Sequence, residues 1–193
     1  MASLLFLILL GLGLLSAVIL IAARNRLVRY RHQVANARGQ IDVQLARRHD
    51  LIPNLVELVR GAMGHERDVL TALVEARGDA MRALQKGGAT PESAEAEERL
   101  SSALAPLLSF VESQPPLMSL DNVRALQEEL SSTENRIAFA RQHYNDSATR
   151  HNEAGETFPA SLFARRSDKA PLWEIPAGAE RVPTIDLRFR AAA

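Results

Sequence analysis

The 193-residue sequence contains no cysteine, and this absence excludes several kinds of site. Without cysteine the chain has no disulfide, no thiolate zinc site, no iron–sulfur cluster and no acylation site of the lipoprotein type. Aromatic residues make up only 5% of the chain, and β-branched residues form no alternating runs, so the main body is not predicted to form a sheet. The formal net charge is zero, and we expect no nucleic-acid partner.

Patterns typical of catalysis or metal binding are also missing from the sequence. None of the five histidines has a carboxylate three residues before it, which the Glu-x-x-His motif of di-metal helical bundles requires. No glycine-rich phosphate loop joins a strand to a helix. We therefore expect no enzymatic activity, no metal and no cofactor, and we expect the histidines to have surface or helix-capping roles.

The first 23 residues predict a membrane-spanning helix. From Leu4 to Ala23 the chain carries no charge, and about twenty helical residues cross a hydrocarbon core of about 30 Å. A cleaved signal peptide would need a basic start, which residues 1–3 do not supply. We expect residues 1–3 to be an N-terminal tip and residues 4–23 to be an uncleaved transmembrane helix. Gly13 and Ala17 form a small-x-x-x-small pair suited to packing against a second such helix.

Positive charge gathers on one side of this span. The residues just beyond the span suit a membrane interface, because they include a tyrosine and several arginines that can bind anionic lipid head groups. Since no Lys or Arg precedes the span, the positive-inside rule places the N-terminus outside and the folded domain in the cytoplasm. The predicted membrane-interface residues are Arg24, Arg26, Arg29, Tyr30 and Arg31.

Residues 24–158 are predicted to be all-α, an up-and-down four-helix bundle that follows the transmembrane helix. Apolar residues recur there at the three-and-four spacing of amphipathic helices. Gly87 and Gly88 end one helix, and Thr90 and Pro91 suit the start of the next. Pro106 predicts a kink or a split in that third helix.

One helix boundary and one tail residue allow alternatives. Asp50 before Pro53 favours a turn that separates the first helix from the second, but the apolar spacing also fits one long helix kinked at Pro53. Ser119 is predicted to cap the fourth helix. Residues 159–193 are predicted to be an extended tail, in which Trp173 either packs onto its own domain or contacts a partner.

Two runs, residues 40–56 and 133–145, are more specific than helix formation requires. The first ends in Pro53-Asn54-Leu55-Val56, and the second begins Thr133-Glu134-Asn135-Arg136-Ile137 and ends in Tyr144-Asn145. Both resemble the LemA family, and the resemblance covers most of residues 1–163. It implies a bacterial membrane protein with a helical bundle, here placed in the inner membrane as a single-pass protein. Nothing in the resemblance implies an enzyme.

The polar members of these runs suggest a polar layer inside the bundle. If the predicted helices begin at one level, equal counts from their ends bring five residues to the same depth. Buried polar groups must be paired, so these residues should bond across helices, with Glu134 facing Arg38. The predicted layer consists of Asn36, Arg38, His65, Glu134 and Asn135.

Two functions fit these features. The first is a non-enzymatic helical scaffold that self-associates at the membrane as a homo-oligomer, with the lipid bilayer as its other partner. The second is a membrane-tethered adaptor, or an envelope-stress signalling component, that binds an unidentified protein partner through the tail and Trp173. Oligomer size separates the two, because a scaffold requires several copies.

Overall fold

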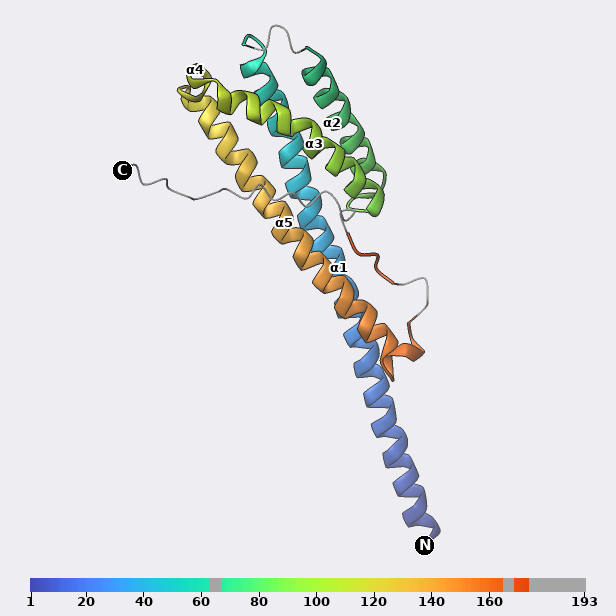
Figure 1. Cartoon of the computed structure of the whole chain (residues 1–193). Coiled ribbons are helices and arrows are strands. Elements are labelled where there is room, and N and C mark those ends of the chain that lie inside the picture. The colour runs from blue at the N-terminus through green and yellow to red at the C-terminus, as the bar shows by residue number, and fades with distance from the viewer. Residues whose placement is uncertain (63–66, 165–168, 174–193) are drawn as a thin grey trace, which may run out of the picture.

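The computed structural model describes residues 1–62, 67–164 and 169–173, and within these residues it contains helices and no strand. The helices are α1 (Ala2–Val59), α2 (Arg67–Gly87), α3 (Pro91–Ser113), α4 (Pro115–Met118), α5 (Asp121–Glu156) and the 3₁₀ turn η1 (Ala160–Leu162). The four long helices alternate in direction, as an up-and-down bundle does, and the prediction of an all-α fold is confirmed (Figure 1).

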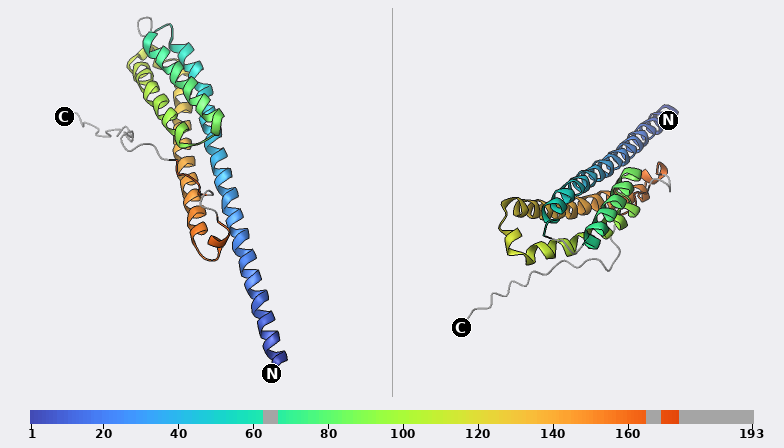
Figure 2. Two further views of the ribbon diagram at one scale, coloured as in Figure 1. Left: turned by 90° about the vertical axis from the view of Figure 1, so that its right-hand side faces the viewer. Right: turned by 90° about the horizontal axis from the view of Figure 1, so that it is seen from above.

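The bundle is built from two pairs of helices. The α1 helix and the α5 helix are distant in sequence but lie side by side in both ribbon views, while α2 and α3 form a hairpin over the end of the bundle farthest from the N-terminus (Figures 1 and 2). We call that end distal and the opposite end proximal. The distal core is rich in leucine and valine from α1, α2, α3 and α5. The proximal core combines alanines with larger residues of α1 and α5 and with Trp173 of the tail.

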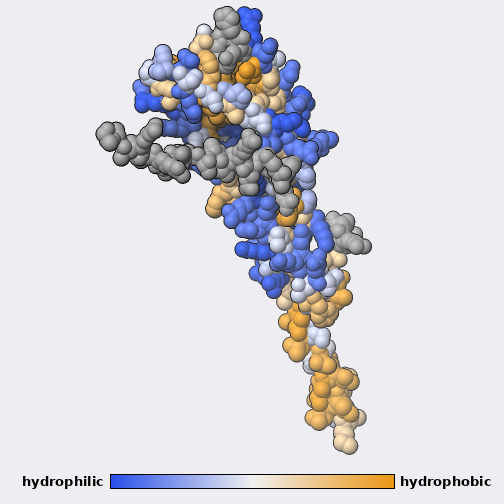
Figure 3. Space-filling view, viewed as in Figure 1, coloured by the Kyte–Doolittle hydropathy of each residue, from blue (hydrophilic) through white to orange (hydrophobic). Residues whose placement is uncertain are grey.

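The N-terminal part of α1 projects from the bundle as a bare apolar stem. It is long and apolar enough to cross a membrane, and none of its most apolar stretch is buried in the protein. Figure 3 shows this stem as a hydrophobic surface below a mostly hydrophilic bundle. A stem of this kind is typical of a membrane-associated protein rather than of a buried core helix.

The predicted turn before Pro53 is wrong, because α1 runs without interruption from Ala2 to Val59. Proline lacks an N–H, so Pro53 leaves the carbonyl of His49, four residues earlier, without its helical donor. Arg77 of α2 supplies that donor, and its Nε lies 2.6 Å from the His49 oxygen. This contact replaces the helical hydrogen bond that Pro53 cannot form. The α1 helix ends only at Val59, two residues before Gly61.

The helix boundaries farther along the chain partly agree with the predictions. Thr90 caps α3 and forms a capping box with Ser93, as the Thr-Pro pair predicts. The helix continues through Pro106, so the predicted split is wrong. Ser119 is not the cap of α5, because its hydroxyl donates to the Pro116 carbonyl and the helix begins one residue after Leu120.

Candidate functional site: a buried charge cluster, a tail clamp and a groove

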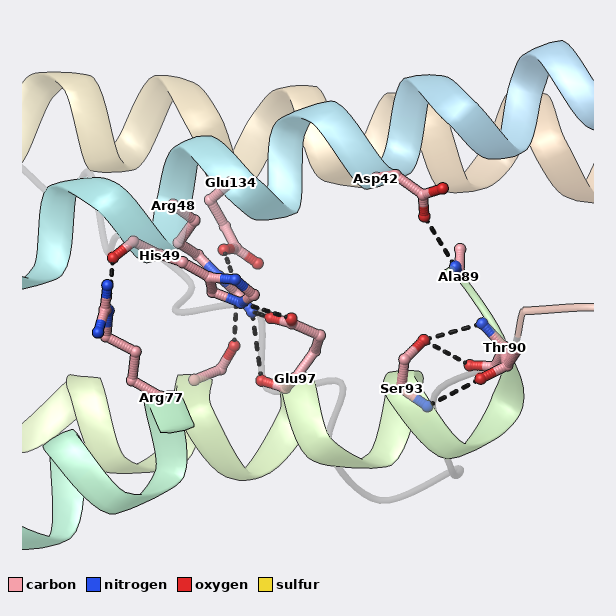
Figure 4. A network of polar contacts seen from close by, with 10 residues as sticks. Asp42, Arg48, His49, Arg77, Ala89, Thr90, Ser93, Glu97 and Glu134 are labelled. Carbon is pink, nitrogen blue, oxygen red and sulfur yellow. Dashed lines mark hydrogen bonds and ion pairs between the residues drawn. The ribbon is translucent and has the colours of Figure 1, made fainter. Parts of the chain in front are cut away.

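Charged side chains meet inside the bundle between the distal and proximal cores. Arg48 and His49 of α1 and Glu97 of α3 are almost fully buried. The Arg48 guanidinium donates to the carboxylate of Glu97 and to the carboxylate of Glu134 on α5, the latter at 2.9 Å. His49 Nε2 donates to the other oxygen of Glu97 at 2.7 Å. We call these four residues the charge cluster (Figure 4).

The charge cluster joins all four long helices. Arg48 also donates to the hydroxyl of Ser101 on α3 at 3.1 Å, and the backbone oxygen of His49 accepts from Arg77 on α2. Removing one partner of such a buried pair leaves an uncompensated charge, which costs about 3–5 kcal/mol. The cluster therefore fixes how α1, α3 and α5 are placed along one another. Its residues do not line the groove described below.

A second polar set holds the hairpin between α2 and α3 against α1. Gly88 adopts a positive φ of 66°, which suits glycine. Asp42 accepts a hydrogen bond from the Ala89 amide at 2.7 Å, and Arg38 donates to the carbonyl of Gly87. Arg38, which the sequence placed opposite Glu134, therefore binds this turn instead.

The tail is clamped along α5 by two asparagines spaced two helical turns apart. Asn145 pairs both polar atoms of its amide with the backbone of Trp173, at 2.9 and 3.3 Å, and Asn152 pairs with Ala170 in the same way, at 2.9 Å for both bonds. The Tyr144 hydroxyl donates to the Pro171 carbonyl at 2.8 Å. We call these side chains and residues 170–173 the tail clamp. It gives the Tyr144-Asn145 signature a physical role.

Trp173 closes the proximal core. Its side chain is only 2% exposed, and its indole N–H donates to the Thr90 carbonyl at 2.9 Å. The prediction that it packs onto its own domain is therefore confirmed, and it is not available to a partner. Burial raises the pKa of the neighbouring Tyr144 hydroxyl, and the charge of Arg38 partly opposes this shift. The hydroxyl therefore keeps its proton at pH values above 10.0, the ordinary pKa of tyrosine, and it keeps its hydrogen bond to Pro171 as well.

An open groove of about 1180 Å³ runs between α1 and α5. Its most exposed apolar residues are Val43, which is 63% exposed, and Phe139, which is 75% exposed, and Met118 and Ala140 also line it. Around them lie small residues, amides and three charged residues. These are Asn36, Gly39, Gln40, Gln44, Glu112, Gln127, Glu128, Ser131, Ser132, Asn135 and Arg136.

The predicted polar layer is wrong. Asn36 and Asn135 are exposed and line the groove, outside the core. Glu134 does pair with an arginine of α1, but that arginine is Arg48 rather than Arg38, and the Glu134 side chain is exposed. His65 lies outside the described residues. The prediction that the histidines have surface or capping roles is also wrong for His49 and His151, which are buried.

The predicted interface residues directly follow the apolar stem. Arg24, Arg26, Arg29 and Arg31 are exposed, and the Arg26 guanidinium donates to the Tyr30 hydroxyl at 3.1 Å and lies 5.5 Å from its ring centre. Gly13 has open space around it, as a residue facing lipid or a second helix would. Packing at Gly13 and Ala17 stays a prediction. Among residues 1–62, 67–164 and 169–173, no group of metal-ligating side chains gathers.

Comparison with known proteins agrees with this architecture. Over 149 residues, 66% of this chain, the sequence is 29% identical to the magnetosome protein MamQ of Magnetospirillum gryphiswaldense. The match spans 55% of that protein's length. The LemA family model matches residues 37–187, which include the C-terminal part of α1, all of α5, the charge cluster and the tail clamp. The chain therefore belongs to the LemA family.

Proposed function

We propose that this protein is a non-enzymatic scaffold, anchored by the α1 stem, that self-associates at the membrane through the α1–α5 groove. The observation that carries the proposal is the exposure of Phe139 and Val43 in a groove that α2 and α3 leave uncovered. Burying one such side chain contributes about 1.5–3 kcal/mol. A second copy of the chain is the occupant that the groove chemistry fits best.

The anchor gives a geometric reason for this choice. Copies in the same membrane present their grooves at the same height, because α1 is one helix from the stem to the groove. At 1.5 Å per residue, Val43 lies about 30 Å beyond Ala23 in every copy. Two grooves can therefore face each other across a two-fold axis along the membrane normal, which makes like residues meet.

The lining suits contact between identical surfaces. An amide both donates and accepts hydrogen bonds, so Asn36, Gln40 or Asn135 can pair with its own copy. The charged lining residues Glu112, Glu128 and Arg136 would be repelled by their own copies, so they must lie at the edge of the contact or pair with a charge of opposite sign. Small residues on both helices allow close approach. At Gly39 in particular, a Cβ atom would meet no heavy atom within 4 Å.

The basic residues after the stem support a cytoplasmic location of the bundle, in a single-pass protein of the inner membrane. Arg24, Arg26, Arg29 and Arg31 follow the stem, and no Lys or Arg precedes it. A protease added to the outer face of the membrane should then leave the bundle intact. Digestion of the bundle from outside would contradict this orientation.

The size of the detergent-extracted full-length protein tests self-association. We expect an oligomer for the native chain and a shift to monomer for Phe139→Glu. Val74→Glu is the matched control, because Val74 is also exposed but lies on α2, away from the groove. Gly39→Leu should also give monomer, since the substitution has room within one chain but blocks a second one. A native chain that is monomeric at all concentrations would contradict the proposal.

A further inference from the structure

The loop between α5 and the returning tail exposes three large apolar side chains within six residues. Phe158 is 76% exposed, Leu162 is 65% exposed and Phe163 is 40% exposed. Single exposed apolar residues are ordinary, but a group of them marks a surface that contacts another apolar phase. Glu156, the acidic residue at the start of the loop, is paired with Lys169 at 2.6 Å.

The loop lies at the proximal end of the bundle, beside the point where α1 continues alone. A Cβ atom on Gly155 would lie 3.2 Å from Ala164 Cβ and 4.0 Å from Leu27 Cδ1, so both ends of the loop meet near Leu27. The intervening residues form the lowest part of the bundle in Figure 1, and the left view of Figure 2 agrees. Figure 3 shows hydrophobic surface continuing from the stem to this level.

The depth of the loop can be counted along α1. Leu27 is four residues beyond Ala23, the last residue of the uncharged stretch, so it lies about 6 Å farther along the helix. The head-group layer on each side of a bilayer is about 5–8 Å thick. The loop extends from the level of Leu27 toward the stem, which brings its aromatic residues into that layer.

We infer that residues 157–163 form a second membrane contact, in which Phe158, Leu162 and Phe163 insert among lipid head groups. Aromatic residues are favoured at this depth, and the four exposed arginines on the adjacent turns of α1 supply cations for lipid phosphates. The inference rests on the proposed membrane span. It adds that α5 as well as α1 is held at the membrane, which restricts the tilt of the bundle and the direction in which the groove faces.

Because the chain has no cysteine, three matched serine-to-cysteine variants of the full-length protein test this. Ser161→Cys places a nitroxide label in the loop, Ser16→Cys places it in the stem and Ser109→Cys places it on α3; all three serines are exposed. The protein is reconstituted into vesicles of phosphatidylcholine and phosphatidylglycerol. Accessibility to oxygen is then compared with accessibility to a water-soluble nickel chelate, and the emission of buried Trp173 verifies folding.

We expect the ratio of oxygen to nickel accessibility to be several-fold higher at residues 16 and 161 than at residue 109. Adding Phe158→Glu and Leu162→Glu should lower the ratio at residue 161 to that at residue 109, and should leave residue 16 unchanged. A native loop whose ratio equals that at residue 109, while residue 16 remains in lipid, would overturn the inference and leave the membrane span standing. If the ratio at residue 16 equals that at residue 109, the proposed membrane span is wrong, and the loop contact is wrong with it.

Discussion

On the distal side of the charge cluster, four helices share a core of large aliphatic residues, whereas on the proximal side α1 and α5 share a smaller core with Ala89, Ala94 and Trp173 of the tail. The distal half is closed by the apolar faces of its helices. The proximal half is closed by Trp173 and by hydrogen bonds from α5 to the tail backbone. The same two helices are thus stabilised by packing at one end and by a clamped segment at the other.

The largest expected effect comes from the boundary between the halves. Glu97→Ala removes the α3 carboxylate that pairs with the buried side chains of Arg48 and His49. It should lower the free energy of unfolding by about 3–5 kcal/mol. Thermal unfolding followed by circular dichroism measures this loss. Glu129→Ala is the matched control, because the Glu129–Arg47 pair is at the surface and should contribute at most about 1 kcal/mol. Equal losses in the two variants would contradict the role of the charge cluster.

A smaller effect should be confined to the proximal half. Trp173→Ala opens the proximal core and should cost about 3 kcal/mol. Hydrogen exchange should then rise over residues 137–148 of α5, and should change little over residues 51–59 of α1, which pack in the distal core. If exchange rises equally in both stretches, the two halves are not stabilised separately.

The smallest expected effect concerns the turn between α2 and α3. Gly88→Ala forces a Cβ into the left-handed region, 3.0 Å from Asp42 Oδ2, and should cost about 1–2 kcal/mol. Gly39→Ala is the control in an open helical position, where alanine should stabilise the helix by about 0.5–1 kcal/mol. Shifts in the midpoint of thermal unfolding should therefore have opposite signs. A shift of the same sign would show that the Gly88 backbone is not under this constraint.

The features that could be predicted from sequence are those set by neighbouring residues. The apolar spacing of the helices and the Thr90–Pro91 start of α3 depend on local geometry, and the structure contains both. The long α1 could not be recognised with certainty, because Pro53 is compensated by Arg77, a residue of another helix. The residues around Pro53 cannot indicate a hydrogen-bond donor that lies in a distant part of the sequence.

The polar layer shows how an error in one boundary shifts a whole site. The predicted register assumes that the first helix ends at Asp50. The α1 helix instead ends at Val59, nine residues later and about 13 Å farther along the helix axis. Glu134 therefore meets Arg48 rather than Arg38. Glu97 and the clamp asparagines were missed because their partners are the side chains and backbone of distant segments.

Cross-linking in the membrane tests the central claim, self-association through the α1–α5 groove, most directly. Ser132→Cys places one thiol at an exposed position of the groove and leaves Phe139 in place, and Val74→Cys places one on α2, in a chain that otherwise has no thiol. A short membrane-permeant bis-maleimide is added to membranes that contain either variant. The account predicts that Ser132→Cys forms covalent dimers in high yield and that Val74→Cys forms few. Equal yields from the two positions, or no dimer from Ser132→Cys, would contradict it.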